Sequence, residues 1–319
     1  MKFKRDMSLW TAGIFLLTVM ILADLGFPWG DEDGKVLMLL RLPKMVTALT
    51  AGAALASGGC LMQSIFRNPL ADPHIMGISS GASLGAATAT LAGGFLSGLS
   101  PHIQGLTVTA AAFTGAIFTA AIIVAAAGRI RRNGTLLIFG VMTGFIVNAV
   151  ISIMQFSTDA ESLKIYHSWS SGSFSYTTWP QIAVMAACIA AGAVISCMMN
   201  KDLDITLFGD EFAERAGADI KHIRYKALIC CCLMTGAVTA FCGPIGFVGI
   251  VAPHIARGLL RTSAHRMILP ASMMTGCIIS LGADMVSGLF SVPVPVSSTM
   301  ALIGIPFILY IMLKPGCSA

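Results

Sequence analysis

Charged residues are scarce in this 319-residue sequence. Asp, Glu, Lys and Arg make up 11% of it, whereas hydrophobic residues make up 56%. Soluble domains carry about 25% charged residues, so this composition excludes a water-soluble protein, because so much apolar surface could not be buried. In lipid, backbone polar groups need partners within the protein, which leaves helices or a closed barrel. The apolar runs span about 20 residues rather than alternating ten-residue segments, so we expect an all-α integral membrane protein.

The sequence also lacks a phosphate-binding loop of the form G-x-x-x-x-G-K-[ST], which excludes this way of binding ATP. None of the nine cysteines forms a C-x-x-C pair, and the three at 230–232 point in different directions around a helix. We interpret the cysteines as small apolar residues within membrane helices. His74 and His254 have no set of metal ligands at suitable spacing, Asp72 being the one candidate nearby. We therefore expect no metal site and no cofactor bound by this chain.

Ten apolar stretches predict ten transmembrane helices within a single polytopic domain, residues 1–319. They lie at about 8–27, 44–64, 79–96, 104–127, 135–156, 180–200, 224–242, 244–260, 268–288 and 296–313. No small-residue cleavage site follows the first stretch, so we interpret it as a retained helix rather than a signal peptide.

Basic residues are unevenly distributed if the N-terminus is cytoplasmic. Only Lys35, Arg41, Lys44 and Lys164 then fall in outer segments, while the other 16 of the 20 Lys and Arg residues fall on the cytoplasmic side. This bias predicts that both termini are cytoplasmic. The net charge of +5 reflects the same rule and is not a signal for nucleic-acid binding, because the basic residues occupy separate loops.

Small residues and polar interruptions indicate how the spans pack and connect. Ala48, Gly52 and Ala56 are spaced by four residues, which favours close approach of helix backbones. The stretch "SIFRNPLADPHIMGISSGASLGA" (64–86) contains two prolines, each preceded by Asn or Asp, and therefore predicts a turn between two spans.

Two polar segments are longer than packing requires. In the cytoplasmic one, about 200–223, "DEFAERAG" predicts a short amphipathic helix ended by Gly217. The outer one, about 157–179, is rich in serine and aromatic residues, which suit the membrane interface or contact with a partner. Its aromatic residues are Trp169, Phe174, Tyr176 and Trp179.

Motifs along nearly the whole chain resemble FecCD-type permeases, the membrane subunits of ABC importers for iron chelates, haem and cobalamin. They are "RLPKMVTALTAGAALASGGCLMQSIFRNPLADPHIMGISSGASLGA" (41–86), "LLIFGVMTG" (136–144), "YHSWSSGSF" (166–174), "LFGDEFAERAGAD" (207–219), "GPIGFVGIVAPHIARGLL" (243–260), "LGAD" (281–284) and "VPVSSTMALIGIPFILYIML" (294–313). Any one of these motifs would be weak evidence, but their shared order and spacing are specific.

The resemblance implies a homodimer around a central pathway, multi-pass in the bacterial cytoplasmic (inner) membrane. It also implies an external substrate-binding protein and two copies of a cytoplasmic ATPase subunit, which would carry ATP and Mg²⁺. The chain itself would be a transport subunit and not an enzyme. The motifs are shared by carriers of ferric siderophores, haem and cobalamin, so the chelate stays open.

On the outer side, the resemblance assigns docking of the binding protein to Arg41 and Lys44. The alternative is that both side chains only anchor the second span at the interface. Family members often carry a further outer Arg shortly after the Ala-Asp of the ninth span, where this sequence has Gly288. Docking geometry is therefore expected to differ from that of such relatives.

On the cytoplasmic side, the resemblance assigns ATPase coupling to Gly209, Asp210, Glu211, Ala213 and Gly217. The three small residues match the family's coupling loop, and the acidic residues belong to its charged rim. The alternative is an ordinary solvated loop.

Asn133 and Gly134 match a short turn that contributes to the family's cytoplasmic gate. A simple turn with glycine at positive φ explains these two residues equally well, so both readings stay open.

Asp284 is the only acidic residue well inside a predicted span. Such a carboxylate is a functional candidate, and as a proton carrier it would make the chain a proton-coupled secondary transporter. We favour a structural role, with hydrogen bonds to neighbouring helix ends. An intramembrane enzyme is disfavoured because no clustered Asp and His or Ser–His arrangement is expected within the spans.

Overall fold

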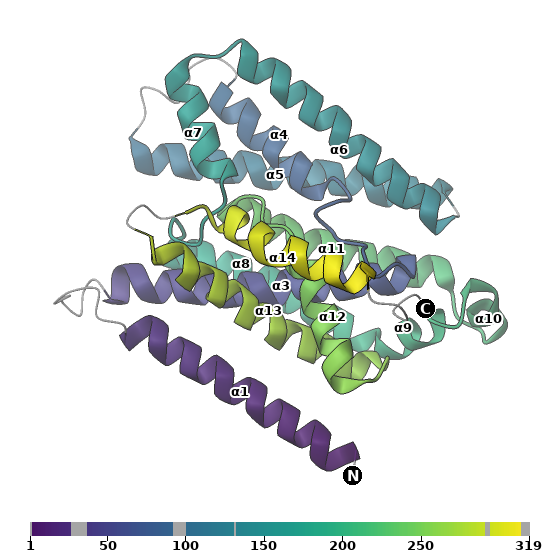
Figure 1. Ribbon diagram of the computed structural model, residues 1–319. Coiled ribbons are helices and arrows are strands. Elements are labelled where there is room, and N and C mark those ends of the chain that lie inside the picture. The colour runs from purple at the N-terminus through teal and green to yellow at the C-terminus, as the bar shows by residue number, and fades with distance from the viewer. Residues whose placement is uncertain (1, 27–36, 92–99, 131, 291–293, 314–319) are drawn as a thin grey trace.

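The computed structural model describes residues 2–26, 37–91, 100–130, 132–290 and 294–313 (Figure 1). Within these ranges the chain forms thirteen α-helices and one short π-helix, and no strand. The elements are α1 (Lys2–Gly26), η1 (Leu37–Arg41), α3 (Leu42–Phe66), α4 (Ile78–Leu91), α5 (Pro101–Arg129), α6 (Asn133–Phe156), α7 (Ala160–Ser170), α8 (Trp179–Met198), α9 (Asn200–Thr206), α10 (Asp210–Arg215), α11 (Ile220–Cys242), α12 (Val248–Leu260), α13 (His265–Gly288) and α14 (Val296–Leu313). The predicted all-α class is confirmed.

Each of the ten predicted spans contains a helix. Among the described residues, seven helices are long and apolar enough to cross a membrane: α1, α3, α5, α6, α8, α11 and α13. Helices α12 and α14 provide shorter apolar stretches, and α4 has 14 residues. Ten crossings therefore stay a prediction, whereas seven helices of the described residues have the length and composition of membrane spans.

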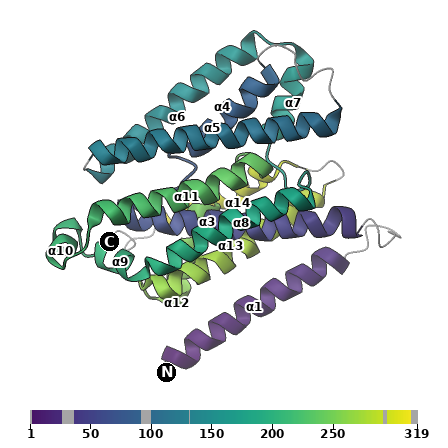
Figure 2. The same cartoon turned by 180° about the vertical axis from the view of Figure 1, so that it is seen from behind.

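Helices α3 and α11 form the centre of the bundle, and α1 lies at its periphery (Figures 1 and 2). The most apolar 18-residue window of α3 is 78% buried and that of α11 is 72% buried, against 0% for α1. A helix that is apolar all round suits a buried position. The polar side chains of α3 therefore have to find partners on neighbouring helices.

Small residues bring α3 against α13 and α12. A Cβ atom added to Gly52 of α3 would collide with the carbonyl oxygen of Gly276 in α13, and Gly276 itself packs on the Ala56 methyl group. Gly59 meets the backbone of Gly249 in α12 in the same way. Only glycine permits such backbone contact, so the predicted packing role of the small-residue stripe is confirmed.

Helices α4, α5, α6 and α7 form a layer on one side of α11 (Figure 1). Within the layer, Gly81 and Gly85 of α4 lie directly against α5. Helix α7 was not predicted, although Asp159 caps it by accepting a hydrogen bond from the Ser162 backbone N–H at 3.0 Å.

The aromatic residues of the 157–179 segment do not share one environment. Phe174 is fully buried, so its predicted place at the membrane interface is wrong. Tyr176 and Trp179 are exposed, and the half-buried Trp169 ring N–H points to the Ala240 carbonyl oxygen at 3.5 Å. Much of this segment therefore packs on its own chain.

The bundle has two distinct ends. Helix α7, η1 and the last turns of α13 lie at one end, which we call the α7 end, and α9 and α10 lie at the other, the α10 end (Figure 1). Helix α1 begins and α14 ends toward the α10 end. An even number of membrane crossings would place the start of α1 and the end of α14 on the same side of the membrane, which agrees with this arrangement. That this side is cytoplasmic stays a prediction.

Candidate functional site

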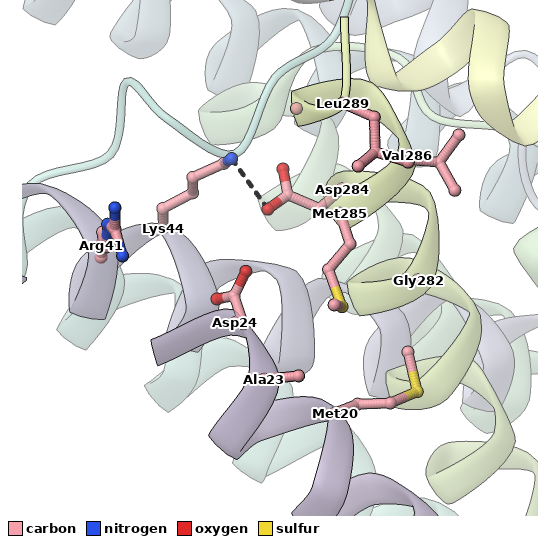
Figure 3. A pocket seen from close by; sticks show the side chains of 11 residues that line it. Met20, Ala23, Asp24, Arg41, Lys44, Gly282, Asp284, Met285, Val286 and Leu289 are labelled. Atoms are coloured by element: carbon pink, nitrogen blue, oxygen red, sulfur yellow. Dashed lines mark ion pairs between the residues drawn. The ribbon is translucent and has the colours of Figure 1, made fainter. Parts of the chain in front are cut away.

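At the α7 end, an ion pair joins α3 to α13. Lys44 Nζ lies 2.9 Å from Asp284 Oδ2 (Figure 3). The Asp284 side chain is 2% exposed and that of Lys44 is 30% exposed, so the carboxylate is shielded from water and depends on the lysine for compensation. We expected Asp284 to form hydrogen bonds with the ends of neighbouring helices. Its partner is instead the side chain of Lys44.

A cavity of about 540 Å³ opens beside this ion pair (Figure 3). It lies between α1, the start of α3 and the last turns of α13. Its walls are Met20, Ala23, Asp24, Arg41, Lys44, Gly282, Asp284, Met285, Val286, Gly288 and Leu289. The structure thus brings Arg41 and Lys44 to one place, as the sequence predicted, and their docking role stays a prediction.

Two further residues of this cavity bear on docking. Gly288, which the family resemblance matches to an outer arginine, lines the same cavity, and a glycine supplies no cation there. Asp24 lies on the α1 side and was not predicted as a site residue. Its place near the end of the first span was the only signal in the sequence.

At the α10 end, residues 200–219 form two short helices. Helix α10 is flanked by Gly209 at φ 108° and Gly217 at φ 87°, both in the left-handed region that favours glycine. The predicted short helix ended by Gly217 is therefore confirmed. Helix α9 was not predicted, because its seven residues carry no strong periodic pattern.

The small residues of this segment do not all face outward. Ala213 is fully buried against its own chain, and a Cβ atom on Gly209 would lie 3.3 Å from Arg67 Nη1. The most exposed large apolar side chains are instead Phe208 and Phe212, with 74% and 55% of their surface accessible and ring centroids 5.5 Å apart. The sequence reasoning missed this aromatic pair, although its spacing of four residues was visible.

Asp210 ties α10 to the rest of the chain. Its carboxylate lies 3.1 Å from Arg67, just after α3, and 3.8 Å from Arg224 in α11. Arg224 also donates a hydrogen bond to the Ile130 carbonyl oxygen at 3.3 Å. Glu211, in contrast, is exposed. Of the predicted coupling residues, Asp210 and Ala213 thus contact the rest of the chain, Gly209 lies beside Arg67, and Glu211 and Gly217 are exposed.

The two predicted gate residues lie in the first turn of α6. Asn133 donates a side-chain hydrogen bond to the Ile65 carbonyl oxygen at 2.8 Å. Gly134 is helical and is not among the glycines with positive φ, so the alternative of a simple turn is wrong. The gate role stays a prediction, but the contact places α6 against the end of α3.

Gln63 makes the same stretch of α3 contact α12. Its side-chain Nε2 donates to the Gly249 carbonyl oxygen at 3.1 Å, and its Oε1 accepts from Arg257. Together with Ile65 and Arg67, this makes residues 63–67 the place where α6, α10 and α12 are tied to one helix. We call these residues the α3 junction.

A fourth connection at the α3 junction contradicts an expectation from the sequence. Ser64 of α3, His265 at the start of α13 and Asp204 of α9 form a chain of side-chain hydrogen bonds. A Ser–His–Asp arrangement therefore exists where none was expected. Ser64 is 1% exposed and its hydroxyl group also lies 2.7 Å from the Cys60 carbonyl oxygen, so it has no access to a substrate. An enzyme activity does not follow from it.

Neither histidine in the proline-containing stretches belongs to a cluster of ligands. Within the described ranges, no three His, Cys, Asp or Glu residues come together as a metal site would require. Near His74, Asp72 Oδ1 accepts a hydrogen bond from the His74 backbone N–H at 2.8 Å. Burial raises the pKa of the Asp72 carboxyl group, and the nearby His74 opposes this shift.

Comparison with known proteins gives one family over almost the whole chain. The profile of the FecCD transport family matches residues 8–314. The cobalamin import system permease protein BtuC of Halobacterium salinarum is 33% identical over 93% of this chain and 78% of its own length. The hemin transport system permease protein HmuU of Yersinia pestis is 30% identical over 89% of this chain and 85% of its own length.

A solved structure supports the same comparison. It is described as an inward-facing conformation of a metal-chelate type ABC transporter, and it aligns with a TM-score of 0.85 and 26% identity. The alignment covers 96% of this chain and 99% of the other. The bundle described above therefore has the fold of that transporter chain.

Proposed function

Because the chain belongs to the FecCD transport family, we propose that it is the permease subunit of an ATP-driven importer of a metal chelate. The chelate would be a ferric siderophore, haem or cobalamin, delivered by a binding protein and released into the cytoplasm. The relatives named above import cobalamin and hemin, which supports the class of substrate without selecting one member of it.

The observation that carries this proposal is the exposed aromatic pair on the segment tied to the α3 junction. Phe208 and Phe212 present apolar surface beside a charged helix, and exposed apolar patches of this kind mark contact sites. We assign this surface to an ATPase subunit, since the chain has no phosphate-binding loop of its own. Two copies of the chain would bind two ATPase subunits, as the family resemblance implies.

Movement of the ATPase subunits would act on the bundle through the α3 junction. Closure driven by ATP binding would favour one of two conformations of the permease, outward-open or inward-open. Helices α6, α12 and α13 would respond together because each is bonded to residues 63–67. The chain itself would catalyse no bond change.

At the α7 end, we assign docking of the binding protein to Arg41 and Lys44, which line one cavity. The ion pair of Lys44 with Asp284 would also hold the start of α3 in place. Charges at the rim of an interface act on association rate and orientation more than on affinity. Without an arginine at Gly288, the partner would be oriented by fewer cations than in relatives that carry one.

The test is uptake of radiolabelled haem, cobalamin and ferric siderophores by cells producing the chain together with its binding protein and ATPase. F208A/F212A should abolish most uptake and release the ATPase subunit during purification. The control is F15A, which removes an equally exposed aromatic ring from α1. Unchanged uptake and intact association in F208A/F212A would overturn the proposal.

The same uptake assay distinguishes the proposed ATP-driven importer from a proton-coupled secondary transporter. A protonophore that collapses the proton gradient while ATP is maintained should leave uptake intact. Uptake that follows the gradient and not the ATP level would favour the secondary transporter. The ion pair with Lys44 argues against it, because Asp284 already has a cationic partner.

A further inference from the structure

Two separate connections join residues 200–219 to the α3 junction. One is the ion pair between Asp210 of α10 and Arg67. The other runs from Asp204 of α9 through His265 to Ser64. They differ in their exposure to water, and this difference decides which of them holds its geometry.

The Asp210–Arg67 pair is accessible to solvent. The side chains are 34% and 42% exposed, so water and salt screen their attraction and the pair contributes little rigidity. Either side chain can exchange its partner for water at low cost. This connection allows α10 to shift relative to α3.

The second connection is enclosed around its histidine. His265 and Ser64 are each 1% exposed, and only Asp204, at 38% side-chain exposure, reaches the surface. Asp204 Oδ1 accepts two hydrogen bonds from the same residue, from the His265 backbone N–H at 2.8 Å and from ring Nδ1–H at 2.7 Å. Two bonds to one residue fix the position of the first turn of α13 relative to α9.

The opposite side of the imidazole ring faces α3. His265 Nε2 lies 2.5 Å from Ser64 Oγ, and the Ser64 hydroxyl group lies 2.7 Å from the Cys60 carbonyl oxygen of the preceding turn. Both ring nitrogens are therefore engaged, each with a different helix. A displacement of α9 cannot leave α3 and α13 in place without breaking a hydrogen bond inside the protein, which is costly where water cannot replace it.

We propose that His265 is a positioning residue. When an ATPase subunit moves residues 200–219, His265 transmits the movement of α9 to both α3 and α13. This inference rests on the proposed function, because it assigns a role in the transport cycle. The chain of hydrogen bonds gives the stiff connection, while the Asp210–Arg67 pair gives the adjustable one.

The test compares three variants of α9 in the importer reconstituted with its ATPase and binding protein. D204L removes both hydrogen bonds to His265, D204N keeps an acceptor oxygen at the same place, and D202L changes a neighbouring aspartate without a described ion pair. Uptake and ATP hydrolysis are measured together. We expect transport per ATP to fall about tenfold in D204L, the order of one lost charge-assisted hydrogen bond. D204N should restore most of it, and D202L should match the wild type.

Two substitutions of His265 test its contacts with Asp204 and Ser64 separately. The shorter amide side chain introduced by H265N can still reach Asp204 but not Ser64, whereas the longer one introduced by H265Q can reach Ser64 but not Asp204. Both should lower transport per ATP, because the proposal requires the two contacts together. S64A should resemble H265N, and S57A, which removes a comparable intrahelical hydroxyl group of α3, should resemble the wild type.

Hydrogen exchange in the chain alone monitors the contact without transport. Amides of residues 200–206 should exchange faster in D204L and H265Q than in D202L, with the rest of the bundle unchanged. If the wild type transports and D204L keeps its transport per ATP, the inference is overturned even when the exchange rates rise. If the wild type neither transports nor binds an ATPase, the proposed function fails and the inference fails with it.

Discussion

The two ends of α3 are held in opposite ways. At the α7 end, the ion pair between Lys44 and Asp284 lies beside a cavity of about 540 Å³, and the Thr47 hydroxyl group lies 2.6 Å from that of Thr177. At the α10 end, the α3 junction carries hydrogen bonds or ion pairs to α6, α10, α12 and α13. One helix therefore has one end beside an open cavity and another end bonded to four other helices.

This difference suits a helix that receives force at one end and presents a surface at the other. Several bonds on residues 63–67 distribute a displacement over four helices. The cavity at the other end leaves room around Arg41 for a docked partner. Each end can be tested by removing its contacts.

The largest effect on stability is expected at the α7 end, because the ion pair there contains a carboxylate that is only 2% exposed. D284L leaves the Lys44 ammonium group without its partner and should lower the free energy of unfolding by about 2–3 kcal/mol, somewhat less than for a fully buried pair because Lys44 is partly exposed. K44M/D284L should recover most of the loss. Thermal unfolding in detergent measures both, and a double variant as unstable as D284L would refute a dependence on this one pair.

A smaller loss of unfolding free energy is expected from a substitution at the α10 end, because the α3 junction keeps its other bonds. Q63L removes the acceptor for Arg257 and the donor to the Gly249 carbonyl oxygen, and should cost about 1–2 kcal/mol in unfolding free energy. T50V, which removes only a hydroxyl group bonded within α3, is the matched control. If Q63L proved more damaging than D284L, the contrast between the two ends would be reversed.

The exposed part of the junction should respond least among its contacts. D210N weakens the pairs with Arg67 and Arg224, and we expect less than about 1 kcal/mol of stability change. The Arg67 pair is screened by solvent, and the mostly buried Arg224 lies 3.8 Å away and keeps its hydrogen bond to the Ile130 carbonyl oxygen. Raising the salt concentration should narrow the difference between D210N and wild type. A large loss that salt does not change would mean that Asp210 acts as a buried charge.

The smallest effect concerns Asp159 at the α7 end. The hydrogen bond from the Ser162 backbone N–H lowers the pKa of the Asp159 carboxyl group. Its contribution to stability is therefore present above the pKa of about 3.9 in the unfolded chain and is lost as the pH falls through the lower folded value. Hydrogen exchange of α7 should speed up over that acidic range in wild type, and D159A should already exchange fast at neutral pH and show no such step.

Predictions that depend on residues close together in the sequence were confirmed, whereas contacts between residues far apart in the sequence were not predicted. Helix positions, the short helix α10 and the packing of Gly52 depend on local pattern, and the structure agrees with them. The pairing of Lys44 with Asp284 and the contact of Ser64 with His265, 201 residues away, depend on which helices become neighbours. No spacing along the chain contains that information.

The misses at α7 and Phe174 have a related cause. A serine-rich aromatic segment suits a membrane interface by composition, but an N-cap at Asp159 starts a helix there and the fold supplies an internal place for the Phe174 ring. Ala213 is a similar case, because its side chain is small enough for a partner's groove and also for the chain's own interior. In each case burial was decided by a surface formed from distant residues.

The sequence by itself determined the solvent of this protein and its class of structure, because 56% hydrophobic residues require lipid and lipid requires helices. Its motifs also determined the family. Only the tertiary structure decided which polar groups of those helices meet, and so where α3 is tied and where it is open. The physical reason is that a buried polar side chain takes whichever partner the packing of small residues brings within hydrogen-bonding distance.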